Sequence, residues 1–190
     1  GEDARRDVHR WRARSSAILT GVSTILMDDP SLNVRYNECE RQPLRIVLDS
    51  NLRISPDARV IKIEGKTLIV TASHDHEAVT RLQDAGAEVL IVATNSNRID
   101  LHALMLDLVA REINEIHIEA GATLCGALLY AGIVDELVLY LAPHLLGTDG
   151  RGMFKFPALE KMADRYTLKI RDVRAVGEDW RVIADVINLS

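Results

Sequence analysis

In "EIHIEAGATLCGALLYAG", residues 115–132, an apolar strand turns at Gly121 into a helix of small and apolar residues that ends near Gly132. A strand followed directly by a helix predicts a βα unit, and such units build parallel sheets. A helix start without bulky side chains offers unpaired N–H groups and a positive dipole end, both of which bind phosphate. The stretch lacks GxGxxG and the Lys-Ser/Thr of a Walker loop. The stretch therefore has two interpretations. It is either a phosphate-binding helix start or, slightly favoured, a structural turn in which Gly126 and Ala127 allow close helix–sheet packing.

Similar apolar runs alternate with helical patterns along the chain. The expected strands cover residues 16–21, 44–50, 67–72, 88–93, 115–120 and 135–143. Helical stripes at 78–85 and 101–109 read as crossover helices, so we expect an α/β fold with a mostly parallel sheet flanked by helices. Residues 165–188 alternate in polarity around a turn at 177–179, which predicts a C-terminal antiparallel hairpin and hence a mixed sheet. Loops are expected at 36–43 and 147–157, within a single domain spanning 1–190.

The composition narrows the possible partners. The chain has 190 residues, a net charge of −5, a pI near 5.7 and a mean hydropathy of +0.01. An acidic chain without a long apolar run predicts no nucleic-acid partner and no membrane partner, and favours a small-molecule ligand. Its two cysteines, Cys39 and Cys125, lie far apart and form no CxxC pair. This usage favours a cytoplasmic protein without a structural metal site.

The N-terminal residues read as the start of a helix, with Asp3 as its expected cap. Open α/β sheets usually begin with a strand. We therefore expect further sequence upstream of residue 1.

Carboxylates and histidines near strand ends give candidate site residues. Glu119 closes an otherwise apolar strand at the edge where α/β sheets bind ligands, so it either accepts hydrogen bonds from a substrate or is an exposed strand-end acid. His117 and Glu119 match the H-x-E of zinc deaminases, but no P-C-x-x-C follows, which excludes that site. The "HDHE" run at 74–77 is interpreted as a helix start after Ser73 and not as a metal site.

Residues 20–35, "TGVSTILMDDPSLNVR", hold a second group of candidates. Asp28 and Asp29 precede Pro30, and either bind a metal or a hydroxyl or form an Asp-Pro turn. Arg12 and Arg35 are candidate phosphate ligands because guanidinium groups match phosphate geometry, although solvent-exposed arginine is the alternative for each.

Two segments carry a family resemblance. T-x-x-x-D-D-P-x-L-x-x-R at 24–35 and E-A-G-x-x-L-x-G-A-L at 119–128, with "RIVLDS" at 45–50, resemble the reductase domain of the bifunctional riboflavin-biosynthesis deaminase/reductase. The resemblance runs from about residue 3 to 185. It implies a dihydrofolate reductase-like fold and NADPH-dependent reduction of 5-amino-6-(5-phosphoribosylamino)uracil. It also implies a homodimer.

The same resemblance assigns roles to individual residues. Family positions that bind the cofactor correspond to Thr24, Asp28, Ser50 and the run Gly121, Ala122, Thr123, Leu124, Cys125, Gly126 and Ala127. Positions that contact the phosphorylated aminopyrimidine correspond to Arg12, Leu32, Arg35 and Glu119. The resemblance thus favours a phosphate cradle at Gly121.

The implied chemistry is hydride transfer to the anomeric carbon of an opened ribosylamine. We expect Glu119 to be the catalytic residue that stabilises developing positive charge there, with a pKa raised by burial. The resemblance also implies that a first strand carrying an active-site lysine, and a zinc deaminase domain, lie outside these residues. The alternatives are a dihydrofolate reductase-like enzyme for another substrate, and a cofactor-binding or assembly module.

Overall fold

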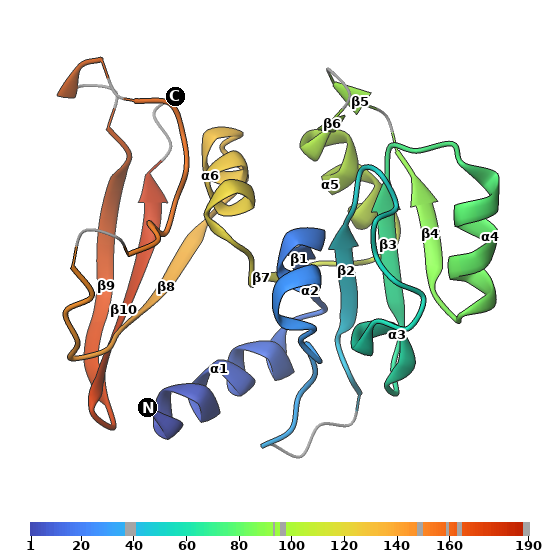
Figure 1. Cartoon of the computed structure of the whole chain (residues 1–190). Coiled ribbons are helices and arrows are strands. Elements are labelled where there is room, and N and C mark those ends of the chain that lie inside the picture. The colour runs from blue at the N-terminus through green and yellow to red at the C-terminus, as the bar shows by residue number, and fades with distance from the viewer. Residues whose placement is uncertain are drawn as a thin grey trace.

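The computed structural model describes residues 1–36, 41–92, 94–95, 98–147, 150–158, 160–162 and 165–187 (Figure 1). Helices and strands alternate through most of the chain, which then ends in two long strands. In chain order the elements are α1 (Glu2–Arg14), β1 (Ala17–Gly21), α2 (Val22–Asp28), β2 (Leu44–Leu48), α3 (Arg59–Lys62), β3 (Thr67–Thr71), α4 (His76–Asp84), β4 (Glu88–Ile91), β5 (Thr94–Asn95), β6 (Arg98–Ile99), α5 (Leu101–Ala110), β7 (Ile116–Ile118), α6 (Ala122–Tyr130), β8 (Glu136–Leu141), β9 (Thr167–Val176) and β10 (Asp179–Ile187).

The larger sheet is parallel and five-stranded, in the order β4-β3-β2-β1-β7. Its strands are apolar at successive positions because both faces are covered. Ile18 packs with α2, α3 and α4 on one face, whereas its neighbour Leu19 packs with α5 and α6 on the other. Both side chains are fully buried. This sheet therefore divides the core into two layers.

The C-terminal strands form a second, antiparallel sheet in the order β8-β10-β9. The β9–β10 hairpin turns at Gly177, which has φ +62, a conformation that favours glycine. A side chain there would also collide with Asp3, because the position of an added Cβ lies 2.5 Å from an Asp3 carboxylate oxygen. The hairpin turn thus packs against the first turn of α1.

The expected fold class is confirmed: a mostly parallel sheet is flanked by helices and followed by an antiparallel hairpin. A single mixed sheet was expected, but the antiparallel strands pair among themselves and form a separate sheet. Neither α3 nor the short β5–β6 pair was expected from the sequence. Parts of the expected loops and strands lie outside the described residues, namely 37–40, 93, 148–149 and 188. Cys39 is among them.

Two helix starts differ in detail from expectation. Gly1, and not Asp3, occupies the N-cap of α1, while Asp3 lies in the first turn. The "HDHE" run does open a helix, but Asp75 caps α4 by accepting a hydrogen bond from the Ala78 N–H. Among the described helices, no segment combines the length and the apolar character that crossing a bilayer requires.

Candidate active site

Glu119 and Arg12 form the centre of the candidate site. Glu119 follows β7, and its N–H donates to the carbonyl of Leu19 on β1, which places it at the carboxyl edge of the parallel sheet. Arg12, in the last turn of α1, donates from Nε to Glu119 Oε1 at 2.5 Å and from Nη2 to Oε2 at 2.6 Å. Its third donor, Nη1, reaches the carbonyl of Asn33 at 2.9 Å. Helix α1, the strand end and the 31–35 segment are thereby joined by one guanidinium group.

The charge state of Glu119 follows from these contacts. Burial by itself acts to raise the pKa of Glu119, but hydrogen bonds and charge from Arg12 and His117 outweigh it and lower the pKa to about 2. His117 Nε2 lies 3.3 Å from Glu119 Oε1. The expectation of a raised pKa is therefore wrong, because it considered burial without the paired arginine. At neutral pH Glu119 is an anion that accepts hydrogen bonds and stabilises positive charge.

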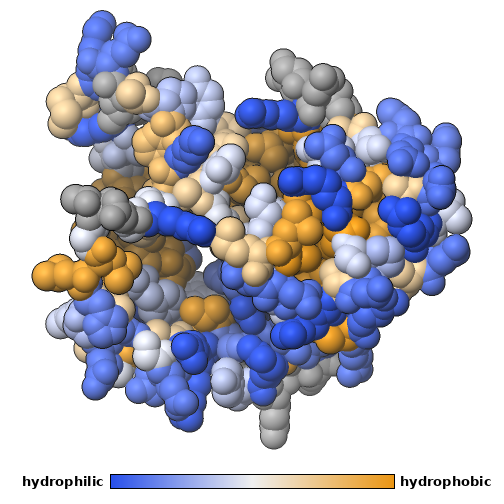
Figure 2. Space-filling view, in the orientation of Figure 1, coloured by the Kyte–Doolittle hydropathy of each residue, from blue (hydrophilic) through white to orange (hydrophobic). Residues whose placement is uncertain are grey.

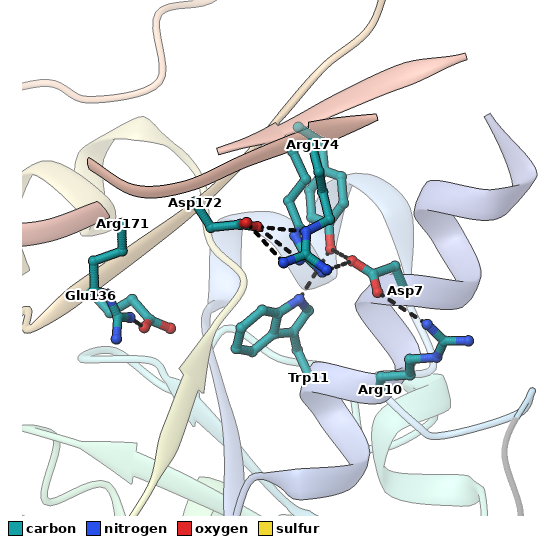
Figure 3. Close-up of polar contacts among 9 residues, drawn as sticks. Asp7, Arg10, Trp11, Glu136, Arg171, Asp172 and Arg174 are labelled. Atoms are coloured by element: carbon teal, nitrogen blue, oxygen red, sulfur yellow. Dashed lines mark hydrogen bonds and ion pairs between the residues drawn. The ribbon is translucent and has the colours of Figure 1, made fainter. Parts of the chain in front are cut away.

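A buried network fixes the position of α1 and hence of Arg12 (Figure 3). Tyr140 on β8 donates its hydroxyl to Asp7 Oδ2 at 2.7 Å, and Arg181 on β10 donates to the same oxygen at 2.7 Å. The indole N–H of Trp11 donates to the Tyr140 hydroxyl at 3.1 Å. Burial opposes ionisation of Asp7, yet the bonds from Tyr140 and Arg181 lower its pKa. The second sheet thus holds the helix that carries Arg12.

The 29–35 segment places the two remaining substrate candidates differently. Leu32 is 3 % exposed and packs in the core, so its side chain is not available to a ligand. Arg35 is exposed, and its backbone N–H donates to Nδ1 of the buried His9. Among the described residues, no carboxylate pairs with the Arg35 guanidinium. Arg12 is already engaged, so Arg35 is the better placed of the two arginines to bind a phosphate.

Asp28 and Asp29, the two acids before Pro30, have different roles. Asp29 ends α2 in a left-handed conformation with φ 37, and its Oδ1 accepts a hydrogen bond from the Arg59 N–H at 2.8 Å. It is therefore a structural turn residue that anchors α3. Asp28 is exposed at the end of α2, one helical turn after the half-buried Thr24. Residues four apart share a helix face, so Thr24 and Asp28 present one polar edge.

The start of α6 is open. Gly121 is the N-cap without a side-chain cap, and an added Cβ there would meet no atom within 4 Å. Its carbonyl accepts from the N–H groups of Leu124 and Cys125, while no acceptor is found among the described residues for those of Ala122 and Thr123. The Cys125 thiol donates to the carbonyl of Ala120. Two adjacent free N–H groups at a helix start suit an anion such as a cofactor diphosphate.

Gly126 has a structural task. A Cβ at this position would lie 2.1 Å from the carbonyl oxygen of Lys155, whose N–H donates to the Ala122 carbonyl at 2.9 Å. Gly126 thus allows close approach of the 150–158 segment, and not of the sheet as expected, while Ala127 is exposed. Gly126 itself is buried, so of the 121–127 run only the first residues form an accessible helix start.

The remaining cofactor candidates lie on α2, whose N-cap contacts α6, and directly after β2. Gly21, the N-cap of α2, lies against α6, because an added Cβ there would be 3.4 Å from a side-chain carbon of Leu124. Ser50 follows β2, the neighbour of β1 in the sheet. Apolar surface gathers near the middle of the face in Figure 2, where Figure 1 places α2, and α2 exposes Leu26 and Met27. The arrangement combines a polar helix start with a neighbouring apolar surface.

Three neighbours of Glu119 and Arg12 were not expected as site residues: His9, Asn33 and His117. His117 could have been found from the period of a strand, because residues two apart share a face with Glu119. His9 lies three positions before Arg12 on the same helix, which places the two side chains on one face. Nothing local in the sequence indicates that Asn33 offers its carbonyl to Arg12.

Comparisons with known proteins identify the family of the chain. A family model described as the RibD C-terminal domain matches residues 1–182. The riboflavin biosynthesis protein RibD of Escherichia coli K12 is 43% identical, over 93% of this chain and 50% of its own length. The 5-amino-6-(5-phosphoribosylamino)uracil reductase of Buchnera aphidicola subsp. Acyrthosiphon pisum is 32% identical, over 96% of this chain and 92% of its own length. The chain thus spans about half of the first relative and most of the second.

A solved structure shows the same fold. Acinetobacter baumannii RibD, form 1, superimposes with a TM-score of 0.84 at 32% identity, over 99% of this chain and 51% of that chain.

Proposed function

We propose that this chain, which belongs to the RibD C-terminal domain family, reduces 5-amino-6-(5-phosphoribosylamino)uracil to 5-amino-6-(5-phosphoribitylamino)uracil with NADPH. The names of the relatives support a reductase of riboflavin biosynthesis. The single observation that carries the proposal is the ionised Glu119 held by Arg12, together with the exposed Arg35, which pairs with no carboxylate among the described residues. A fixed anion, together with a cation that no described carboxylate neutralises, suits a substrate that carries a phosphate and develops positive charge where it reacts.

The substrate side of the site has a defined chemical task. The ribosylamine opens to an imine, in which the ring oxygen has become a hydroxyl and the former anomeric carbon is the electrophile. This carbon accepts a hydride and the nitrogen takes a proton, which gives the ribitylamine. Glu119 stabilises the positive charge of the protonated imine, since a fixed anion in a partly buried site acts more strongly than one in water. Arg12 orients Glu119, while Arg35 binds the sugar phosphate.

The cofactor side rests on the helix start. NADPH supplies the hydride when it is bound. We assign its diphosphate to the free N–H groups of Ala122 and Thr123, which the open space at Gly121 leaves accessible. The exposed Asp28 and the half-buried Thr24 and Ser50 are assigned to its polar groups. Cys125 and Leu124 contribute to the same first turn, whereas Gly126 and Ala127 act through the packing of α6.

NADPH oxidation in the presence of the phosphoribosylaminopyrimidine tests the proposal. We expect oxidation that depends on the substrate, with the ribityl compound as product by mass spectrometry. The dephosphorylated substrate is the matched control and should react only at much higher concentration. NADPH binding without oxidation would instead favour a cofactor-binding module, and equal reaction of both substrates would favour a reductase of another compound.

A homodimer in the cytoplasm is the assembly and the place that we propose. The antiparallel sheet exposes Leu141, Ile170 and Trp180, which a second copy would cover. The cysteine usage fits a reducing compartment. Light scattering at micromolar concentration should give twice the mass of the chain, and a monomer at all concentrations would remove the dimer.

A further inference from the structure

The segment that carries Arg35 is held by side chains and not by secondary structure. Residues 29–35 belong to no helix or strand. Asp29 and Leu32 have positive φ values of 37 and 45, a region that residues other than glycine seldom adopt. Such a backbone persists only where its surroundings fix it. The position of the Arg35 side chain therefore depends on the groups that bind the neighbouring backbone.

Two side chains bind the backbone just before Arg35. Arg12 donates to the carbonyl of Asn33 at 2.9 Å. The amide of Gln42 binds both backbone groups of the buried Val34, because Oε1 accepts from its N–H at 2.8 Å and Nε2 donates to its carbonyl at 3.2 Å. The backbone is thus fixed as far as Val34.

His9 of α1 makes the contact at Arg35 itself. Its Nδ1 accepts from the Arg35 N–H at 3.2 Å. His9 is 4 % exposed, and its ring meets the ring of Tyr36 edge-on, with 4.8 Å between the centroids. A neutral imidazole whose Nδ1 accepts carries its proton on Nε2. Burial, followed by the charges of Arg12 and Arg35, lowers the pKa of this imidazole and outweighs the opposing charge of Glu119, so the ring is neutral at pH 7.

We propose that His9 is a positioning residue, whose Nδ1 fixes the Arg35 backbone and thereby the direction in which the Arg35 guanidinium meets the substrate phosphate. This inference rests on the proposed function, in which Arg35 binds that phosphate. His9 and Arg12 lie three positions apart and share one face of α1. That face orients both charged groups of the site, Glu119 through Arg12 and Arg35 through His9.

Two substitutions separate the acceptor atom of His9 from the packing of its ring. His9→Phe keeps a flat ring beside Tyr36 but removes the acceptor, so the Arg35 N–H loses its partner. His9→Asn removes the ring but places an amide oxygen near the position of Nδ1. A positioning role predicts that Asn restores what Phe loses. A role in ring packing alone predicts the reverse.

Amide hydrogen exchange tests the contact without any substrate. We expect the Arg35 amide to exchange about 10-fold faster in His9→Phe than in the wild type, as for the loss of one hydrogen bond. It should stay close to the wild-type rate in His9→Asn. The Val34 amide, which Gln42 holds, is the internal control. An Arg35 amide that exchanges equally in the wild type and in His9→Phe overturns the proposal.

Nitrogen-15 NMR of the wild-type ring gives a readout that needs no variant, in case His9→Phe does not fold. At pH 7 the spectrum should show a proton on Nε2 of His9 and none on Nδ1. A proton on Nδ1 would exclude the hydrogen bond from Arg35 and would overturn the proposal.

Steady-state kinetics tests the consequence for the substrate. In His9→Phe we expect KM for the phosphorylated substrate to rise about 10-fold, with kcat and KM for the dephosphorylated substrate nearly unchanged. His9→Asn should recover most of this loss. In an Arg35→Ala background His9→Phe should add almost nothing, because His9 acts through Arg35. Additive effects of the two substitutions, or a fall in kcat at unchanged KM, would contradict the positioning role.

Failure of the proposed function has a different signature. Arg35→Ala alone would then leave KM for the phosphorylated substrate unchanged, while the Arg35 amide would still exchange faster in His9→Phe. Failure of the positioning role leaves the effect of Arg35→Ala on KM in place and removes the effect of His9→Phe on the amide.

Discussion

Around Glu119 the chain places charged groups in contact, whereas at the start of α6 two backbone N–H groups have no acceptor among the described residues. The Glu119–Arg12 pair is assembled from segments 107 positions apart and is held by side chains of the second sheet. The helix start lies within one consecutive stretch of the chain and has open space at Gly121. We propose that the first region is ordered before a ligand binds and that the second is completed by a ligand. We infer that substrate charge is recognised by side chains and cofactor phosphate by backbone.

The largest effect is expected at the charged region. Glu119→Gln keeps the shape of the side chain but removes the negative charge that stabilises the imine. We expect kcat to fall by on the order of 100-fold, as for the loss of one transition-state electrostatic contact. NADPH affinity, measured by fluorescence titration, should stay within twofold because the helix start is untouched. Wild-type turnover with unchanged substrate affinity would show that Glu119 has no catalytic role.

The Glu119–Arg12 pair predicts that part of the folding stability is lost at low pH. The pKa of Glu119 is about 2 in the folded chain and 4.5 ordinarily. A depressed pKa stabilises the folded state above about pH 4.5, and this contribution is lost as the pH falls toward 2. It amounts to on the order of 3 kcal/mol. Urea unfolding of the wild type and of Glu119→Gln from pH 6 to 3 should show the difference between them shrinking with falling pH, and a constant difference would contradict the ion pair.

Substitution of Arg35 tests whether this residue binds the substrate phosphate or is only an exposed arginine. Because its guanidinium has no partner among the described residues, Arg35→Ala should leave the melting temperature nearly unchanged. We expect KM for the phosphorylated substrate to rise about 10- to 100-fold, as for a lost charge-assisted hydrogen bond. KM for the dephosphorylated substrate should stay the same, and an equal rise for both would remove Arg35 from the phosphate site.

Two glycines of α6 sharpen the contrast between binding and packing. Gly126→Ala collides with the Lys155 carbonyl, so we expect a loss of about 1–3 kcal/mol in the free energy of unfolding. Gly121→Ala meets no atom and has φ −73, so the loss should stay below about 1 kcal/mol, while NADPH binds roughly tenfold more weakly. Thermal unfolding and NADPH titration of both variants check this. If Gly121→Ala bound NADPH like the wild type, the helix start would not hold the cofactor.

The strands of the parallel sheet were predictable because their signal is local. Continuous apolar runs such as 46–48 require cover on both faces, and the structure buries all three residues. The four-residue α3 is too short to show helical periodicity. The division into two sheets depends on which edges meet, and no local pattern encodes that.

The sequence identified Glu119 as a site residue but did not predict its low pKa. Glu119 stands out because an acid ends an apolar strand. Its low pKa could not be foreseen, since Arg12 approaches only through the packing of α1 on Asp7, Tyr140 and Arg181. For the same reason Arg12 was expected to bind phosphate, although its donors are used within the chain.

The most direct test of this account is the structure of the protein in complex with NADPH and the phosphorylated substrate. The account predicts diphosphate oxygens within about 3 Å of the Ala122 and Thr123 nitrogens, with the sugar phosphate at Arg35 and the reacting carbon facing Glu119. A dinucleotide bound elsewhere, with the start of α6 free of it, would contradict the account.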